Sequence, residues 1–224
     1  MTSRRGDAAS LDPVAFIRER TRLAPVRGVP EVRLHMAHEA TGLWRLTAIA
    51  NREAPPPYWA FPWAGGLALA RHLLDHPAVV AGRRVFDLGS GSGLVAIAAL
   101  KAGAAEATAA EVDPFGVAAI GLNATANEVA VRVVSADVTG GAAPEADVVT
   151  VGDLFYDALL AARVTAFLDR SLAGGAVVLV GDPGRAYLPR ERLRLVAEYA
   201  TSDVGEVENA PLKTTGVFAF QSKS

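Results

Sequence analysis

Short apolar runs alternate with amphipathic segments along most of the chain. The apolar runs predict five β-strands, at Arg84–Leu88, Ala107–Glu111, Val131–Ser135, Asp147–Val151 and Ala176–Val180. The amphipathic segments that follow predict helices at Gly93–Ala102, Pro114–Asn127, Ala158–Ser171 and Leu188–Tyr199. Apolar strands separated by helices form parallel sheets covered on both faces. The pattern therefore predicts an α/β fold with a doubly wound, mostly parallel sheet.

The two ends of the chain show other patterns. Ser10 or Asp12 before Pro13 predicts a helix through about Arg22, and apolar spacing from Gly65 predicts another that stops at Pro77. Between these helices, Val32–Met36 and Trp44–Ile49 predict a hairpin around Thr41-Gly42, and at the far end Thr201–Val207 and Thr215–Gln221 predict an antiparallel edge hairpin. We expect residues 1–55 to be an extension packed on a core domain of residues 56–224.

Composition and charge exclude several classes of protein. The 224 residues are 51% hydrophobic and 21% charged, which fits a globular domain and excludes a disordered or fibrous chain. A net charge of -2 gives no general attraction for nucleic acid. The absence of cysteine excludes disulfides, thiolate zinc sites and a cysteine nucleophile. Charges interrupt every long apolar run, so we expect a soluble protein without a membrane partner. We also expect a monomer.

A glycine loop follows the first of the five apolar strands. It reads Asp87-Leu88-Gly89-Ser90-Gly91-Ser92-Gly93 and leads into an alanine-rich helix. Glycines allow a tight turn and a close approach to a ligand. A dinucleotide fingerprint would need a glycine where Leu94 stands, and no Gly-Lys-Ser/Thr follows for a phosphate loop. The remaining pattern, D-x-G-x-G-x-G, resembles the first motif of the class I, seven-strand S-adenosylmethionine methyltransferases.

Two acidic residues beyond the loop are candidates for contacting such a cofactor. Glu111 ends the next strand, where a carboxylate can accept hydrogen bonds from both ribose hydroxyls. Asp113 before Pro114 fits a helix cap better. Asp137 lies just past the third strand, where the resemblance places an acceptor for the adenine amino group, although a loop acid in water is the alternative.

The segment after the fourth strand is the leading candidate for contacting the acceptor substrate. It reads Gly152-Asp153-Leu154-Phe155-Tyr156-Asp157 and lies where open α/β folds bind ligands. It lacks the two prolines that follow the Asn or Asp of methyltransferases acting on exocyclic or amide nitrogens, which disfavours DNA adenine and glutamine as targets. His72 and His76 stand four apart without a third ligand, so we expect no metal.

Nearly the whole chain beyond its N-terminal tail resembles the lysine methyltransferases of the electron transfer flavoprotein β subunit. The likeness lies in Glu31-Val32-Arg33-Leu34, Pro57-Tyr58-Trp59-Ala60, Trp63-Ala64-Gly65-Gly66, the glycine loop, Gly152–Asp157 and Gly181-Asp182-Pro183-Gly184-Arg185. It implies a Rossmann-like seven-stranded sheet, S-adenosylmethionine as methyl donor and a protein lysine as acceptor. It also implies that Trp63 lines the cofactor pocket and that Asp153, Tyr156 and Asp157 form the lysine entrance. A bacterial chain would be cytoplasmic, and a eukaryotic one would work in the mitochondrial matrix.

Methyl transfer to lysine requires the neutral amine, whose pKa is ordinarily about 10.4. A carboxylate beside the amine raises that pKa, so Asp153 or Asp157 is assigned to capture and alignment of the side chain. The alternatives are a general-base role for Asp153, a helix-capping role for Asp157 and core packing for Tyr156. Arg185 either contacts the substrate or belongs to a surface turn. A methyltransferase of another protein such as a ribosomal one, an enzyme for a small amine and a non-catalytic cofactor-binding module remain alternatives for the whole chain.

Overall fold

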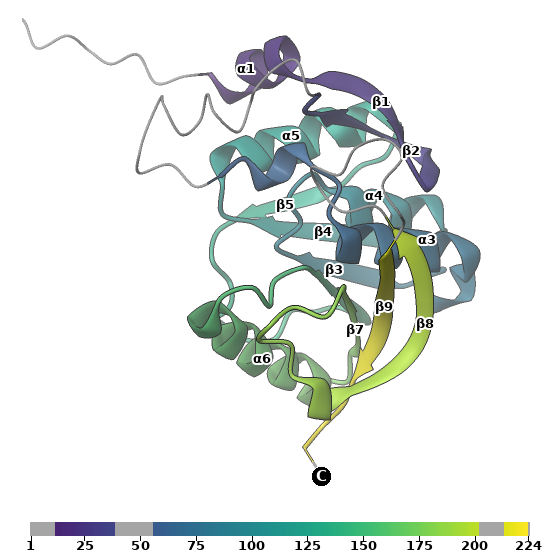
Figure 1. Ribbon diagram of the computed structural model, residues 1–224, viewed down its shortest axis with the longest axis vertical. Helices are drawn as coiled ribbons and strands as arrows, with labels where there is room; N and C mark the ends of the chain where they lie inside the picture. The colour runs from purple at the N-terminus through teal and green to yellow at the C-terminus, as the bar shows by residue number, and fades with distance from the viewer. Residues whose placement is uncertain (1–11, 39–55, 202–212, 224) are drawn as a thin grey trace, which may run out of the picture.

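The computed structural model describes residues 12–38, 56–201 and 213–223 and is built around a seven-stranded sheet (Figure 1). Its strands are β3 (Arg84–Leu88), β4 (Glu106–Glu111), β5 (Arg132–Ser135), β6 (Val148–Gly152), β7 (Val177–Asp182), β8 (Leu193–Thr201) and β9 (Lys213–Phe220). The strand order is β5-β4-β3-β6-β7-β9-β8. Strands β3 to β7 pair in parallel, while β9 pairs antiparallel with both β7 and β8. The predicted mostly parallel α/β sheet with an antiparallel C-terminal pair is confirmed.

Helices cover both faces of this sheet. They are α3 (Ala64–Asp75), α4 (Leu94–Lys101), α5 (Pro114–Ala126) and α6 (Ala158–Ala173). Successive side chains of a strand point to opposite faces. Accordingly, Val85 packs in the core shared with α3, α4 and α5, whereas Phe86 packs against Phe167 of α6 on the other face. The double winding therefore leaves the carboxyl ends of the parallel strands together at one edge.

A small N-terminal unit lies over α5 (Figure 1). It consists of α1 (Pro13–Arg20), capped by Asp12, and a hairpin of β1 (Arg22–Val26) and β2 (Val29–Met36). Two side chains, of Asn123 in α5 and of Asn127 at its C-terminal end, hold β2. The amide oxygens of Asn127 and Asn123 accept the backbone N–H of Arg33 and of His35 at 2.9 and 2.7 Å. The extension thus packs on the core, while its proposed boundary at residue 55 stays a prediction.

The sequence missed one strand that pairs with Val32–Met36, and its predicted hairpin with Trp44–Ile49 stays a prediction. Val32–Met36 pairs with Arg22–Val26, the segment immediately before it, and Trp44–Ile49 lies outside the described residues. Pro25 obscured the strand at Arg22–Val26, because proline is unfavourable inside a sheet. It is tolerated here since β1 is an edge strand of a two-stranded sheet.

The predicted helix over Leu188–Tyr199 is wrong. After a short 3-10 turn at Arg190–Arg192, the chain forms the edge strand β8. A bulge shifts the pairing with β9 between Leu195 and Ala197, so Val196 breaks the alternation of the strand. Leu193, Val196 and Ala197 then fall at the i, i+3, i+4 spacing that indicates a helix. The strand is fixed by β9, which is remote in sequence.

Only Thr201 of the predicted Thr201–Val207 strand lies within the described residues, whereas Thr215 and most of the second predicted strand belong to β9.

Candidate active site

A cavity of about 430 Å³ lies at the carboxyl ends of β3, β4, β5 and β6. The glycine loop, the ends of these strands and the segment before α3 form most of its wall. The lining residues predicted from the sequence are Trp63, Asp87, Leu88, Gly89, Ser90, Gly91, Glu111, Asp137, Asp153 and Tyr156. Gly93 and Asp157 are not among the lining residues. Open α/β sheets place their ligands at this edge.

The glycine loop bends sharply under the cavity. Gly89 and Gly91 have positive φ angles of 65° and 56°, a conformation that other residues adopt only with strain. A Cβ on Gly89 would lie 2.7 Å from the Leu154 side chain. Gly93 also has a positive φ and begins α4, where a Cβ would press on Ile120 at 3.3 Å. Gly89 and Gly91 bring bare backbone to the cavity floor, and Gly93 lets α4 start directly behind it.

Asp87 is buried at the end of β3 beneath the loop. Its two carboxylate oxygens accept hydrogen bonds from the hydroxyls of Ser90 and Thr150, the second at 2.8 Å. Burial raises the pKa of Asp87 to about 6, and the two hydroxyls oppose that rise. The side chain therefore braces the loop from below and fixes the direction of the Ser90 hydroxyl.

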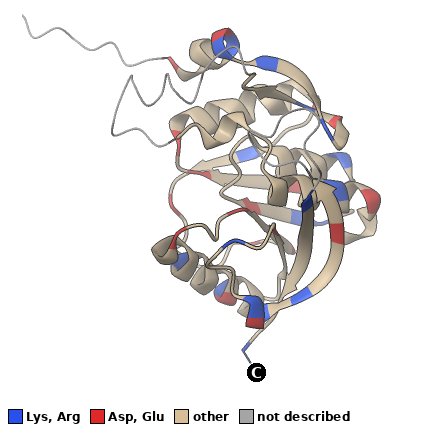
Figure 2. Ribbon diagram, viewed as in Figure 1, with Lys and Arg blue, Asp and Glu red and all other residues tan. Residues whose placement is uncertain are grey.

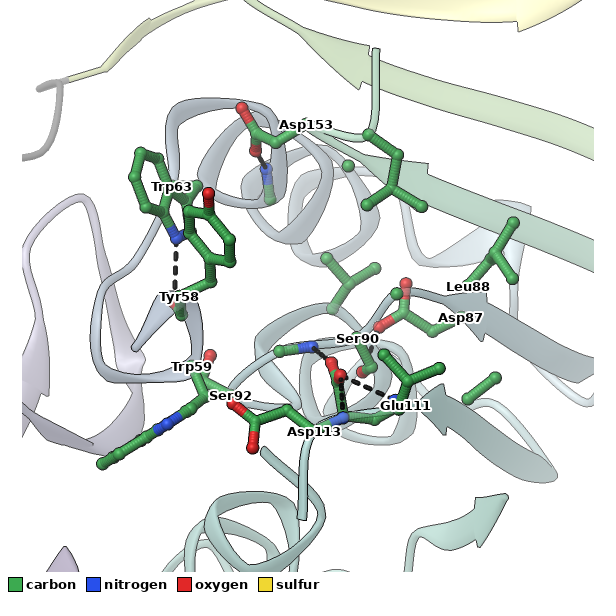
Figure 3. Close-up of a pocket in the computed structure, with 18 of the residues that line it drawn as sticks. Tyr58, Trp59, Trp63, Asp87, Leu88, Ser90, Ser92, Glu111, Asp113 and Asp153 are labelled. Carbon is green, nitrogen blue, oxygen red and sulfur yellow. Dashed lines mark hydrogen bonds between the residues drawn. The ribbon is translucent and has the colours of Figure 1, made fainter. Parts of the chain in front are cut away.

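Glu111 reaches back from the end of β4 to the glycine loop (Figure 3). One oxygen accepts the Gly91 N–H at 2.7 Å, and the other accepts the amides of Val112 and Asp113 at 2.7 and 2.9 Å. Gly116 of α5 leaves room for it, since a Cβ there would lie 2.7 Å from Cγ of Glu111. Backbone amides thus hold a carboxylate at the cavity wall with acceptor sites left for a ligand.

The other two acids beyond the loop have local partners. Asp113 accepts the Phe115 N–H at 2.9 Å and caps α5, as the sequence predicted. Asp137 accepts both the hydroxyl and the amide of Thr139 and pairs with Arg163 at 2.7 Å. The Thr139 hydroxyl is the main reason that the pKa of Asp137 is lowered. Asp137 therefore faces the cavity as a firmly ionised acceptor.

Aromatic rings form the opposite wall of the cavity. The Trp63 indole donates to the Tyr58 carbonyl at 2.8 Å, and its ring meets the Tyr58 ring edge-on at 5.7 Å. The Tyr58 ring is also 5.9 Å from that of Tyr156, which is 47% exposed. The Trp59 ring points away from the cavity and stacks on Phe115 (Figure 3). Trp59 is thus a packing residue, while Trp63 and the two tyrosines face the ligand space.

Asp153 lies above Tyr58 and Trp63, at the end of β6 (Figure 3). It is 8% exposed and has a left-handed backbone with φ of 63°. One oxygen accepts the Gly66 N–H of α3 at 2.9 Å, and the other accepts Nη2 of Arg185 at 2.7 Å. Burial raises the pKa of Asp153, and the Arg185 charge counteracts that rise. Arg185 also lies over the Trp63 ring, 5.8 Å from its centroid.

Asp157 has a structural role in this arrangement. Its side chain accepts the Leu160 N–H at 2.9 Å and caps α6, the alternative considered from the sequence. Phe155 is fully buried in the core against α6, so the segment alternates between core and cavity.

Among the described residues, no group of three or more histidine, aspartate or glutamate side chains is placed to hold a metal ion. No helix in the described part of the chain is long and apolar enough to span a membrane.

Comparison with known proteins identifies the family. The chain is 37% identical to the electron transfer flavoprotein beta subunit lysine methyltransferase of Xenopus laevis, over 93% of this chain and 87% of the relative. It is 35% identical to the Homo sapiens protein of the same name, over 97% and 86%. The chain belongs to the electron transfer flavoprotein β-subunit lysine methyltransferase family. It is a methyltransferase, as the motifs of the sequence predicted.

Two other matches agree with the class of enzyme and its fold. Residues 69–176 match the family model described as ribosomal protein L11 methyltransferase (PrmA). A solved structure of a putative RNA methyltransferase from Pyrococcus horikoshii superimposes with a TM-score of 0.57 at 18% identity, over 82% of this chain and 100% of that one. The class I methyltransferase fold is thereby confirmed.

Three cavity residues of this family member were missed or left open by the sequence reasoning. The sequence marks Tyr58 only as part of a family motif, and it gives no signal for Arg163, which lies on α6, far along the chain from Asp137. Arg185 was assigned to substrate contact or a surface turn, yet it pairs with Asp153 inside the cavity wall. The Gly-Asp-Pro-Gly-Arg motif was the available signal for it.

Proposed function

We propose that this chain is an S-adenosylmethionine-dependent protein-lysine N-methyltransferase that acts on the electron transfer flavoprotein β subunit. The family relationship carries the proposal, because two relatives of that name align with 93% and 97% of this chain and with 87% and 86% of their own length. The cavity supports it with a glycine loop, a strand-end acid and an aromatic wall in one place. A bacterial chain would meet this partner in the cytoplasm, and a eukaryotic one in the mitochondrial matrix.

The residues of the cavity fit the proposed cofactor. Glu111 offers free acceptor positions for the ribose hydroxyls, and the backbone of Gly89 and Gly91 allows a ligand to approach closely. Asp137 is placed to accept from the adenine amino group, and Trp63 closes the side opposite the glycine loop. When bound, the cofactor supplies a methyl group made electrophilic by its sulfonium. The volume lies within the range of about 300–1,000 Å³ typical of ligand pockets.

The lysine side chain is proposed to enter between Tyr58, Tyr156 and Trp63. Aromatic rings exclude water from a methylene stem and hold a nucleophile in a fixed direction. Asp153 lies at the inner end of this wall and is proposed to align the amine. Asp157 sets the entrance indirectly, because its cap fixes the start of α6 next to Tyr156.

Exposed apolar side chains near the cavity favour a protein as acceptor. Val112, Tyr58 and Tyr156 line the cavity and are exposed; Leu159 lies in the first turn of α6 and is 78% exposed. The amide of the exposed Tyr187 donates to the Phe155 carbonyl beside Tyr156. Clustered exposed apolar groups indicate a contact surface. We call these five residues the apolar rim, and a small amine would have no use for it.

Mass spectrometry of the flavoprotein tests the proposal. The recombinant electron transfer flavoprotein is incubated with the enzyme and S-adenosylmethionine, and methylated lysines are mapped, with Glu111→Ala as the binding-deficient variant. We expect lysine methylation that the variant loses together with cofactor binding in calorimetry. Cofactor binding without methylation of the flavoprotein would reject the acceptor. Ribosomal protein L11 is the second acceptor to try, because residues 69–176 match that family model.

A further inference from the structure

Arg185 makes an unusual set of contacts for a residue beside a candidate lysine site. Its Nη2 is 2.7 Å from Oδ1 of Asp153, and its guanidinium lies over the Trp63 ring. Its Nε lacks a hydrogen-bond partner and is 3.9 Å from Oδ2 of Asp182, which is buried and also without a partner. The guanidinium therefore lies between two buried carboxylates, with one face on the cavity.

These contacts change what Asp153 can do. Its second oxygen accepts the Gly66 N–H at the start of α3, so both oxygens are engaged. An approaching ammonium group would therefore meet the positive charge of Arg185 on the same carboxylate and be repelled by it. A lysine that arrives at the wall as a neutral amine meets no such repulsion. The arrangement therefore distinguishes the two protonation states of the acceptor.

The reaction needs the neutral state. A free carboxylate next to a lysine favours the ammonium form and raises the amine pKa, whereas a guanidinium favours the neutral form and lowers it. An unpaired Asp153 would thus work against the methyl transfer that its alignment role serves. Pairing with Arg185 removes that conflict while the carboxylate remains in place.

We propose that Arg185 is a positioning residue that neutralises Asp153, so that the acceptor lysine is held beside a closed ion pair and is favoured as the free amine. This inference rests on the proposed lysine methyltransferase function and adds the residue that sets the protonation state of its substrate. Asp182 is assigned to holding Arg185, because its Oδ1 accepts the amides of Gly184 and Arg185 at 2.7 Å and so fixes the turn that carries the guanidinium.

The other charged or titratable groups around this position are spread over several elements. Tyr58 comes from the segment before α3, and Tyr156 and Asp157 come from the segment between β6 and α6. Glu111 ends β4, and Asp182 ends β7. Burial raises the pKa of Tyr156, so it is a neutral phenol near pH 7. Within the described cavity wall, Arg185 and Arg163 are the cations, and Arg163 is paired with Asp137.

A bisubstrate compound measures the amine pKa directly. The probe is an aza analogue of S-adenosylmethionine whose methyl group is replaced by an aminobutyl arm carrying a ¹⁵N-labelled amine. Its ¹⁵N chemical shift is followed by NMR between pH 6 and 11 when bound to the wild type, Arg185→Gln and Arg185→Lys. Arg190→Gln is the matched control, because Arg190 lies in the same connection between β7 and β8 and its guanidinium donates to the Gly184 carbonyl instead.

We expect the amine pKa in the Arg185→Gln complex to exceed that in the wild type by about 1 or more. Arg185→Lys and Arg190→Gln should stay close to the wild-type value. An unchanged value in Arg185→Gln, with the compound bound, would show that Arg185 only supports the fold. An equal rise in Arg190→Gln would assign the effect to the turn.

The flavoprotein assay separates this inference from the proposed function. With the natural acceptor, the pH midpoint of kcat/KM should rise in Arg185→Gln and be retained in Arg185→Lys. A wild-type enzyme that shifts the probe's amine as expected but leaves the flavoprotein unmethylated would overturn the proposed acceptor and leave the role of Arg185 standing. Failure of the wild type to bind the probe would overturn both.

Discussion

At the scale of single residues, the site depends on carboxylates whose surroundings differ. Asp87 is buried below the glycine loop, Glu111 is held by backbone amides, and Asp153 is paired with a guanidinium. Each carboxylate has a different task because hydrogen bonds, burial and neighbouring charge act on it in different proportions. Replacing an aspartate with asparagine removes its charge but keeps its shape, so such substitutions show which of these tasks depends on the charge.

Asp153→Asn should bind S-adenosylmethionine with unchanged affinity and lose turnover by about 10²-fold, the cost of a misplaced reacting group. Asparagine keeps the side-chain shape and tolerates the left-handed backbone at this position. It loses the charge that holds Arg185. Calorimetry gives the affinity, and radiolabelled methyl transfer to the flavoprotein gives the rate. Unchanged turnover would remove Asp153 from the site.

Asp87→Asn tests the cost of burying a carboxylate. The folded pKa is raised from 3.8 to about 6, so the folded protein binds a proton more tightly than the unfolded chain does. The stabilising effect of that proton is complete below the unfolded pKa and is lost as pH rises through about 6. Relative to wild type, Asp87→Asn should therefore gain about 2 kcal/mol of unfolding free energy between pH 4 and pH 7. Urea unfolding at both pH values measures the difference; a constant difference would contradict it.

At the scale of elements, glycines allow α3 to lie against the ends of β6 and β7. A Cβ on Gly65 would lie 2.1 Å from the Gly181 carbonyl oxygen and 2.7 Å from Oδ2 of Asp153, and a Cβ on Gly181 would lie 2.2 Å from the Gly65 carbonyl oxygen. Only this approach lets Gly66 donate to Asp153 at 2.9 Å. Helix packing thus positions a side chain of the candidate site.

Gly65→Ala should destabilise the protein by about 2 kcal/mol. The added methyl group would meet the backbone of Gly181, which is held in β7 and cannot move aside as a flexible side chain could. Asp153 should lose its contact with α3, and methyl transfer should fall. Gly121→Ala in α5 is the matched control, since a Cβ there meets nothing within 4 Å. It should stabilise by about 0.5–1 kcal/mol through helix propensity. Denaturant unfolding measures the free energy of unfolding of both variants. A Gly65→Ala variant as stable as the wild type would refute the steric argument.

At the scale of the whole molecule, charge gives little direction to partner binding. Figure 2 shows Lys and Arg interspersed with Asp and Glu over the elements, and the net charge of the chain is -2. Recognition of a protein acceptor is therefore assigned to the apolar rim. Close packing of apolar and aromatic groups supplies most of the affinity in such interfaces.

Leu159→Asp should raise KM for the flavoprotein about tenfold, which corresponds to about 1.4 kcal/mol, and leave cofactor affinity unchanged. Leu195→Asp on β8 is the matched control, because Leu195 is also exposed but lies on the edge strand away from the cavity. Steady-state kinetics with the flavoprotein and calorimetry with S-adenosylmethionine provide the two readouts. Equal KM values for both variants would place the docking surface elsewhere.

Much of this protein is determined locally along its sequence. The five parallel strands, the helices between them and the glycine loop follow from apolar periodicity and from glycines whose backbone other residues cannot adopt. Glu111 and the Asp113 cap follow for the same reason, because a strand end and a helix start are set by nearby residues. Family motifs added the acceptor class, which no local rule supplies.

Tertiary structure decided the features that join distant segments. Val196 obscures the strand pattern of β8, and only pairing with β9 makes that segment a strand instead of a helix. The pairing of Arg185 with Asp153 joins the ends of two neighbouring strands, so neither residue's spacing predicts it. Local periodicity reports which backbone hydrogen bonds a segment favours. Partners for an edge strand or a buried charge exist only after the chain has folded, because they come from residues that are far away in sequence.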